Sequence, residues 1–416
     1  MPPQLKPKRV AEIMLASLGL ELVSCTLLQT LWAGYGHICA ITAKTSVKEV
    51  AAHWARVCGE TGGANNSFHL ILKFISPPHT DGDEGHLRKM LSYDVEQYFY
   101  NKVTPILEDD VAVATCLVST RHLEGQASAK ELRGLTATIM TDLRRKFPVA
   151  GEKRSLLDSR QVHSAVDWLA KFHASSWKLL PDELSKFVLP PLEEMKKRQS
   201  HPSTGDEKLW LNGGYTYLAT RRKEYASLAE DVDSEWSEAF CALFEGSSSS
   251  IAEMVAEFLT PCGRPFETYI HGDVKSENLF TTELGDRVAF FDFQYVGLGL
   301  GVCDLAKLFT CSVPIKMLTG GGTIWDELPM QDGERTLLEK YQETLLGRIP
   351  PGKESLNYPM DIFIRHWETA LVDWCRFQAS WGFWGNTEWL EARVRSILKD
   401  QGWRDWLQQE VSNLPR

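Results

Sequence analysis

The strongest constraint on what this chain can fold into is the segment His271 to Phe280, HGDVKSENLF. Short apolar runs typical of β-strands flank it, Glu267 to Ile270 before it and Val288 to Phe291 after it. Gly285 and Asp286 have the residue types of a tight turn and lie just before the second run. The pattern therefore predicts a short polar loop between two buried strands.

The polar residues of this loop suit one kind of chemistry. Asp273 and Asn278 lie on the loop, and Asp292 leaves the end of the following strand, so three oxygen-bearing side chains can converge. Magnesium favours oxygen ligands, and in phosphoryl-transfer sites one or two carboxylates hold it while substrate phosphates and water complete the octahedron. Asn278 and Asp292 suit that role, and Asp273 can accept a proton from an attacking hydroxyl. Lys275 either contacts a phosphate oxygen or is a solvated loop charge.

Together, HGDVKSEN and the later FFDFQ resemble the catalytic and metal loops of protein-kinase-like small-molecule phosphotransferases. The branch they resemble comprises aminoglycoside phosphotransferases, choline kinases and ecdysteroid-kinase-like proteins. The resemblance extends from about Leu27 to Asn386 and implies an α+β, bilobal protein-kinase-like fold. It makes Asp273 the catalytic base and Asn278 and Asp292 the magnesium ligands. Asp304, in GVCDLA, becomes the acidic residue that steadies the catalytic loop, and His271 a structural loop residue.

The first third of the chain supplies the other part of an ATP site by the same resemblance. Lys73 lies on the predicted strand HLILKFI, and Glu96 follows on the predicted helix SYDVEQYFY. A strand lysine paired with a helix glutamate can hold nucleotide phosphates in line for transfer.

Two further segments complete the expected nucleotide contacts. The hairpin tip WAGYGH would cover the phosphates, with Gly34, Tyr35 and Gly36 letting backbone N–H groups approach. Met140 and Asp142, within TIMTDL, fall in the expected hinge whose backbone meets adenine.

The coarse architecture is a small strand-rich lobe, residues 1–140, followed by a larger helical lobe, residues 141–416. The predicted strands of the first lobe are 27–32, 37–42, 67–75, 111–120 and 135–140, and its predicted helices are an amphipathic segment near Val10 to Leu20 and residues 88–102. In the second lobe, Asp158 can cap a helix, and further helical segments are predicted at 217–228, 234–244, 250–259, 333–346 and 359–384.

The sequence identifies the residues that would bind the acceptor less clearly than those of the loop at Asp273. Of the 14 tryptophans, several fall late in the chain, where an aromatic wall could receive a quaternary amine through cation–π attraction. The alternative is that each fills the core of the helical lobe. The favoured substrate-side residues are Asp373, Arg376, Trp381 and Trp384, because the resemblance implies that their helix faces the cleft.

Composition excludes some functions. The net charge of −10 argues against a nucleic-acid surface and is compatible with a cationic small substrate. The nine cysteines never form a C-x-x-C pair, which disfavours a structural zinc site and a disulfide framework and favours a reducing cytoplasm. Glu12 and Glu21 interrupt the N-terminal apolar run, so we expect a helix there rather than a signal peptide, and no membrane span. The sequence leaves the oligomeric state open.

These observations predict a kinase that uses ATP and Mg²⁺ to phosphorylate a hydroxyl of a small molecule, either a secondary metabolite, a steroid or an amino alcohol. The alternative is a pseudokinase that binds nucleotide or a partner without turnover. A protein kinase is disfavoured, because no Asp-Phe-Gly, activation loop or Ala-Pro-Glu sequence follows Asp292.

Overall fold

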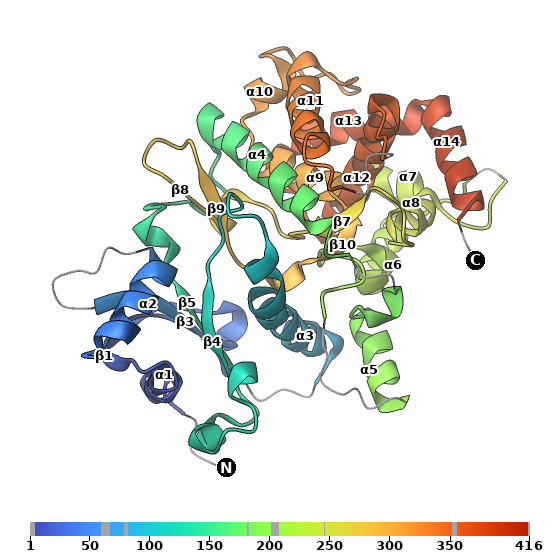
Figure 1. The fold of residues 1–416 in the computed structure, drawn as a ribbon. Coiled ribbons are helices and arrows are strands. Elements are labelled where there is room, and N and C mark those ends of the chain that lie inside the picture. Colours follow the sequence, from blue (N-terminus) through green and yellow to red (C-terminus); the bar gives the residue numbers. More distant parts are fainter. Residues whose placement is uncertain are drawn as a thin grey trace. The chain divides into compact units, whose positions relative to one another are not determined.

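The computed structural model describes residues 5–59, 67–78, 82–180, 183–200, 208–244, 246–351 and 356–414. The chain divides into two compact units. Unit 1 comprises Met1–Ile106 with Val113–Lys146, and unit 2 comprises Leu107–Ala112 with Phe147–Arg416. Unit 1 contains an antiparallel sheet and unit 2 is mainly helical, which confirms the predicted α+β class (Figure 1).

Unit 1 is built on a five-stranded antiparallel sheet with strand order β1-β2-β3-β5-β4. The predicted hairpin and third strand are present, although the first strand begins earlier than expected. The strands of unit 1 are β1 (Glu21–Thr30), β2 (Gly36–Lys44), β3 (Ser67–Ile75), β4 (Cys116–Ser119) and β5 (Thr136–Thr141). The helices of unit 1 are α1 (Pro7–Ala16), α2 (Lys48–Cys58) and α3 (Glu84–Tyr98). The segment before β4 lacks the predicted strand, and the predicted helix at 88–102 ends in a π-turn from Phe99 to Val103.

The core of unit 1 forms where α1 packs on the sheet. Val10 and Met14 of α1 are fully buried together with Leu70 of β3 and Ala43 of β2. Full burial of each large aliphatic side chain contributes about 1.5 to 3 kcal/mol. The amphipathic pattern near the N-terminus is therefore that of a core helix.

Unit 2 contains two small sheets among many helices. Strand β7 pairs with β10, and β8 lies between β6 and β9. The strands are β6 (Val149–Ala150), β7 (Glu267–Ile270), β8 (Leu279–Thr281), β9 (Val288–Phe290) and β10 (Gly297–Leu300). The helices are α4 (Ser159–Ser176), α5 (Pro191–Ser200), α6 (Arg222–Glu230), α7 (Glu235–Cys241), α8 (Ile251–Leu259), α9 (Val302–Cys311), α10 (Ile315–Thr319), α11 (Asp332–Leu346), α12 (Met360–Trp381), α13 (Thr387–Lys399) and α14 (Gln401–Ser412).

Local sequence fixes the start of α4. The carboxylate of Asp158 accepts the backbone N–H of Gln161 at 2.9 Å, and the Gln161 side chain accepts the N–H of Asp158, which is a capping box. The helix then packs against α11 and β7. Because β7 leads directly into the loop at His271, α4 supports the segment that carries the polar residues.

The late tryptophans are mostly core residues. Trp367, Trp374, Trp389 and Trp403 are buried in the helices of unit 2, whereas Trp381 is 55% exposed. Packing rather than ligand binding accounts for the four buried rings.

Two general expectations can be compared with the structure. All nine cysteines are free thiols. Within the described ranges, we find no helix with both the length and the apolar character that crossing a bilayer requires.

Candidate active site

The loop after β7 brings three of the predicted residues into direct contact. The carboxylate of Asp273 accepts a hydrogen bond from Nδ2 of Asn278 at 3.0 Å. It also forms an ion pair with Nζ of Lys275 at 3.1 Å. Nδ2 of Asn278 also donates to the backbone carbonyl of Asp273 at 2.8 Å. Asp273 and Asn278 are both buried. The loop therefore holds a carboxylate with one amide and one ammonium group around it.

Lys275 is bound between two carboxylates. Its ammonium also lies 3.3 Å from Glu277. Burial lowers the pKa of Lys275, but the charges of Asp273 and Glu277 outweigh that effect, so its pKa lies above the usual value. The ammonium group stays charged at neutral pH and neutralises part of the negative charge on the loop.

Asp292 follows β9 in a strained backbone conformation. Its φ and ψ are 65° and 57°, the left-handed region that residues other than glycine rarely adopt. Its Oδ1 accepts a hydrogen bond from Nε2 of Gln294 at 2.6 Å. The N–H of Phe291 donates to the carbonyl of Asn278 at 3.0 Å, which ties the two segments together. Strain of this kind concentrates at functional sites, where the surrounding structure maintains it.

The oxygen donors of this loop fit magnesium. Asn278 donates with its Nδ2, so its amide oxygen is the atom that can bind a cation, and Asp292 supplies a carboxylate. Among the described residues, no group of three or more His, Cys, Asp and Glu side chains is arranged to hold a metal ion. An amide oxygen and a carboxylate oxygen, as in Asn278 and Asp292, are donors that suit Mg²⁺, which takes few protein ligands and completes its shell with phosphate oxygens and water.

A buried carboxylate fixes the backbone of the loop. Asp304 of α9 is fully buried and accepts the N–H of His271 at 2.6 Å and the N–H of Gly272 at 2.9 Å. Burial raises the pKa of Asp304. The hydrogen bond from His173 and nearby positive charges lower the pKa by more than burial raises it, so it lies below the usual value. The carboxylate is therefore ionised and accepts two backbone N–H groups of the loop.

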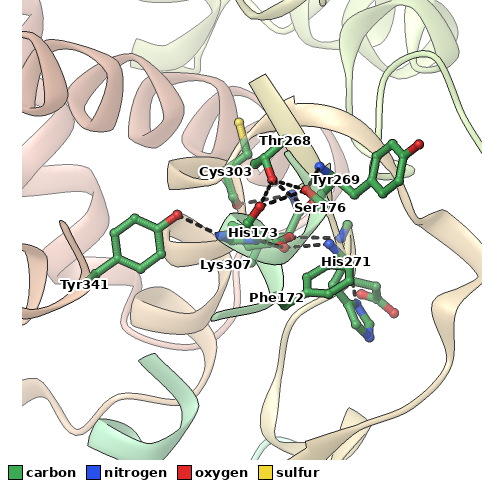
Figure 2. Close-up of polar contacts among 12 residues, drawn as sticks. Phe172, His173, Ser176, Thr268, Tyr269, His271, Cys303, Lys307 and Tyr341 are labelled. Atoms are coloured by element: carbon green, nitrogen blue, oxygen red, sulfur yellow. Dashed lines mark hydrogen bonds and ion pairs between the residues drawn. The ribbon is translucent and has the colours of Figure 1, made fainter. Parts of the chain in front are cut away.

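Sequence reasoning missed His173 of α4, which supports Asp304. Figure 2 shows the His173 ring with the hydroxyl of Tyr341 on one side. The distances are 2.7 Å from Nδ1 to that hydroxyl and 3.1 Å from Nε2 to Asp304. His173 is fully buried. A polar residue within an apolar helix face is the signal that could have identified it.

Hydroxyl groups join α4 to the start of β7 in the same region. The side chains of Ser176 and Thr268 lie 2.5 Å apart, and both donate to the carbonyl of His173 (Figure 2). The Ser176 hydroxyl also accepts the N–H of Tyr269 at 2.9 Å. These bonds fix α4 against the strand that precedes the loop.

His271 has a structural position in this arrangement. Its Nε2 lies 2.9 Å from the carbonyl of Phe291, and its Nδ1 accepts the N–H of Asp273 at 3.3 Å. Burial lowers the pKa of His271 below its usual value. A neutral ring with both nitrogens engaged links the loop to the strand end before Asp292.

In unit 1, Nζ of Lys73 lies 2.6 Å from Oε2 of Glu96, and both side chains are nearly buried. Lys73, Glu96 and Met140 line one small cavity. Asp142 has a different position, because its carboxylate forms a two-point ion pair with Arg144 at 2.6 and 2.9 Å. Only its backbone remains for the predicted hinge contact.

The hairpin tip of unit 1 is held by side chains. The segment Trp32–Gly34 forms a 3₁₀ turn in which the N–H groups of Gly34 and Tyr35 bond to carbonyls of the turn. Tyr35 is buried, and its hydroxyl lies 2.8 Å from Nδ1 of His86 on α3. The ammonium of Lys89 lies 4.4 Å from the Tyr35 ring centroid and 4.5 Å from that of Trp32. In this conformation two of the tip's N–H groups are engaged within the turn.

The predicted substrate-side residues separate into two groups. Arg376 is fully buried and donates to Asp373 at 2.7 Å and to the carbonyl of Thr216 at 2.7 Å. Asp373 lines a cavity of about 290 Å³ together with Asn212, Arg222, Glu253 and Glu257.

The aromatic group is already occupied by a protein cation. The guanidinium of Arg221 lies 5.1 Å from the Trp381 ring centroid and 5.8 Å from that of Phe377. Trp384 packs edge-on against Trp374, with centroids 5.4 Å apart. Trp381 and Trp384 are not among the residues that line the cavity at Asp373.

Solved structures of low similarity include small-molecule kinases. Choline kinase from Cryptosporidium parvum Iowa II is 12% identical with a TM-score of 0.40, covering 95% of this chain and 90% of that chain. Ethanolamine kinase from Plasmodium vivax is 11% identical with a TM-score of 0.38, covering 96% and 86%. Macrolide 2'-phosphotransferase from Brachybacterium faecium is 11% identical with a TM-score of 0.39, covering 98% and 97%.

Sequence comparison identifies the family. No curated protein matches the chain significantly. The profile of the ecdysteroid kinase-like family matches residues 51–321, which include the Lys73 strand, the loop at Asp273 and the strained Asp292. The chain therefore belongs to the ecdysteroid kinase-like family.

Proposed function

We propose that this protein transfers the γ-phosphoryl group of ATP to a hydroxyl of a small molecule in a magnesium-dependent reaction. Family membership supports small-molecule kinase activity in general. The observation that carries the finer proposal is the Asp273 carboxylate, bound by Asn278 and Lys275 on a loop whose backbone Asp304 holds. Phosphoryl transfer needs little covalent help, so alignment and charge compensation are the main tasks of such a site.

Asp273 would act as the general base. Its carboxylate can orient the acceptor hydroxyl and take its proton, a contribution typically worth about 10²- to 10⁴-fold in rate. The Lys275 ammonium, 3.1 Å from that carboxylate, balances its negative charge. The loop can hold this geometry without substrate, because the N–H groups before Asp273 are bound to Asp304.

Asn278 and Asp292 would hold the metal. Bound magnesium supplies charge neutralisation at the phosphate oxygens. The amide oxygen of Asn278 and the carboxylate of Asp292 would fix its position relative to Asp273. The strained left-handed backbone of Asp292 supports a functional role, because such strain is kept where the surrounding structure maintains it.

In unit 1, Lys73 would bind nucleotide phosphates. Its ion pair with Glu96, at 2.6 Å, orients an ammonium group that would otherwise sample many rotamers. Met140, on the neighbouring strand and lining the same small cavity, would contact the adenine.

The cavity at Asp373 is our proposed acceptor site. Arg376 fixes Asp373 and also holds the carbonyl of Thr216, next to the segment Asn212–Gly214. Gly214 approaches Gly272 closely, so this segment packs directly on the catalytic loop. The Arg221 guanidinium already lies near the Phe377 and Trp381 rings, which favours a hydroxylated acceptor in the polar cavity over a quaternary amine against the aromatic rings.

The test is a screen for ATP consumption with Mg²⁺ against a library of hydroxylated metabolites, steroids and amino alcohols. We expect at least one acceptor to stimulate ATP use and to gain a phosphate group detectable by mass spectrometry. The Asp273→Asn variant is the matched control and should leave both signals near background. Tight nucleotide binding without ATP use for any acceptor would instead identify a pseudokinase.

A further inference from the structure

A second cavity of about 210 Å³ lies in unit 2, lined by α8, the segment at Arg264–Phe266, α12 and α14. None of the residues assigned above to catalysis, metal or acceptor binding lines it. It adjoins the segment that precedes β7, whereas the catalytic loop follows the other end of that strand.

Aromatic rings form the walls of this cavity. The ring of His366 lies 5.3 Å from Phe258, 5.8 Å from Phe266 and 5.9 Å from Trp406, measured between centroids. Phe258 and Trp406 are 5.1 Å apart and nearly edge-to-face. Such walls favour a planar ring, because they offer apolar area and π faces at low conformational-entropy cost.

One ring nitrogen of His366 has a defined role. Tyr358 is buried, and its hydroxyl lies 2.5 Å from Nδ1 of His366. Burial raises the pKa of Tyr358 well above its usual value and lowers the pKa of His366 to about 3, so both groups are uncharged at neutral pH. In the described part of the chain the Tyr358 hydroxyl has no other hydrogen-bond partner, so its proton goes to Nδ1. The ring proton of His366 is therefore on Nε2.

That N–H has no partner of its own. Nε2 of His366 makes no hydrogen bond with any residue in the described ranges, although His366 lines the cavity. A free donor on the wall of a cavity can bind an acceptor atom of a ligand that enters it.

Two charged side chains, Arg264 and Glu410, also line the cavity. The Arg264 guanidinium lies 4.6 Å from the Phe258 ring centroid and 3.1 Å from its partner Glu267. Its Nη1 is buried and has no hydrogen-bond partner in the part of the chain that the structure describes. Glu410 of α14 supplies the one carboxylate of the lining. Because Arg264 is already paired with Glu267, an anionic ligand would lack a full counter-ion, whereas a cationic ligand would offer no acceptor to the Nε2–H of His366.

We propose that this cavity binds an uncharged, planar ring compound whose carbonyl-type oxygen accepts the Nε2–H of His366. A carboxamide suits the lining best, because its oxygen matches His366 and its N–H groups match Glu410. The site is independent of the proposed kinase reaction, and its failure would leave that reaction untouched.

The test compares three probes of similar shape on the unmodified protein: benzamide, benzoate and benzylammonium. Calorimetry or ligand-observed NMR should show benzamide binding about ten-fold or more tightly than either charged probe. Equal affinities, preference for a charged probe or no benzamide binding would overturn the proposal. Because this comparison uses the unmodified chain, it decides the question even if a variant fails to fold.

A cavity-filling variant locates the binding. Ile362→Trp places a ring into the cavity and should weaken benzamide binding about ten-fold or more. Val232→Trp adds the same ring at a side chain that is 88% exposed, outside the cavity lining, and should leave binding unchanged. Unchanged affinity in Ile362→Trp would show that benzamide binds elsewhere.

Discussion

The loop His271–Asn278 and the hairpin tip Trp32–Gly36 are both short glycine-bearing turns beside strands, yet different forces hold them. In both a glycine is obligatory, because a Cβ on Gly272 or Gly36 would lie within 2.5 Å of a backbone carbonyl oxygen. The loop His271–Asn278 is bound to the buried carboxylate of Asp304 through two N–H groups. The tip is closed by its own turn and by aromatic contacts to α3.

This difference shows how a fold can fix one turn and leave another adjustable. Asp304 belongs to a helix remote in sequence from the loop, so moving the loop would disrupt the core of unit 2. The contacts of the tip depend on one hydroxyl and one ammonium group. Replacing them by contacts to phosphate would cost less free energy than breaking the buried hydrogen bonds of the loop to Asp304. A rigid catalytic loop and an adjustable covering turn would suit phosphoryl transfer.

The largest effect should come from Asp304→Ala. It leaves the N–H groups of His271 and Gly272 and the ring of His173 without their buried acceptor, which costs about 3 to 5 kcal/mol. Urea denaturation should show that loss. As a control, Asp233→Ala removes an exposed carboxylate of the same unit and should change stability by less than about 0.5 kcal/mol. Equal stability of Asp304→Ala and the parent would remove the basis for calling the loop rigid.

Asp292→Gly separates ligand binding from structure. Glycine relieves the left-handed strain but loses the bond to Gln294, so stability should stay within about 1 kcal/mol of the parent. Magnesium-dependent ATP affinity should nevertheless fall about ten-fold or more, because the carboxylate proposed to bind the metal is gone. Calorimetric titration with ATP in the presence and in the absence of Mg²⁺ measures the magnesium-dependent part of the affinity. Unchanged MgATP affinity would reject the metal role.

Acid should act on the loop through Asp304. Its pKa in the folded protein lies below the usual 3.8, so its contribution is present above that pH and is lost as the pH falls through the folded value. In Asp304→Asn this contribution is absent at every pH. The stability difference between parent and variant should therefore shrink below about pH 4. A difference that stays constant down to acid unfolding would show that Asp304 is not ionised in the fold.

The smallest effect should come from the tip. Tyr35→Phe keeps the ring and removes only the bond to His86, worth about 1 kcal/mol. Amide exchange at the N–H groups of Gly34 and Tyr35 should accelerate about five-fold. In Lys89→Met, loss of the cation over two rings should have a similar effect, at about 0.5 to 2 kcal/mol. No acceleration in either variant would mean that the turn alone closes the tip and that the comparison drawn above fails.

Short-range patterns predicted much of this. Strand β3, strand β7 and the capped start of α4 follow from alternation and capping residues within a few positions. Asp273 and Asn278 were expected to lie together on one loop, and they are in contact. The ion pair of Lys275 with Asp273 was not predicted, because Lys275 was expected to contact phosphate or solvent.

Contacts between remote segments could not be predicted in the same way. His173 and Asp304 are 131 residues apart, and no local pattern relates them. The position of Arg221 beside Trp381 also depends on packing, which periodicity does not specify. The segment 111–114 has β-favouring residues but lies outside β4.

The most direct test of the central claim is turnover by Asp273→Asn, measured with an acceptor found by screening and compared with its nucleotide affinity. We predict that turnover falls about 10²- to 10⁴-fold while MgATP affinity and stability stay close to those of the parent. Near-normal turnover in that variant would contradict the assignment of Asp273 as the base and, with it, our account of the loop.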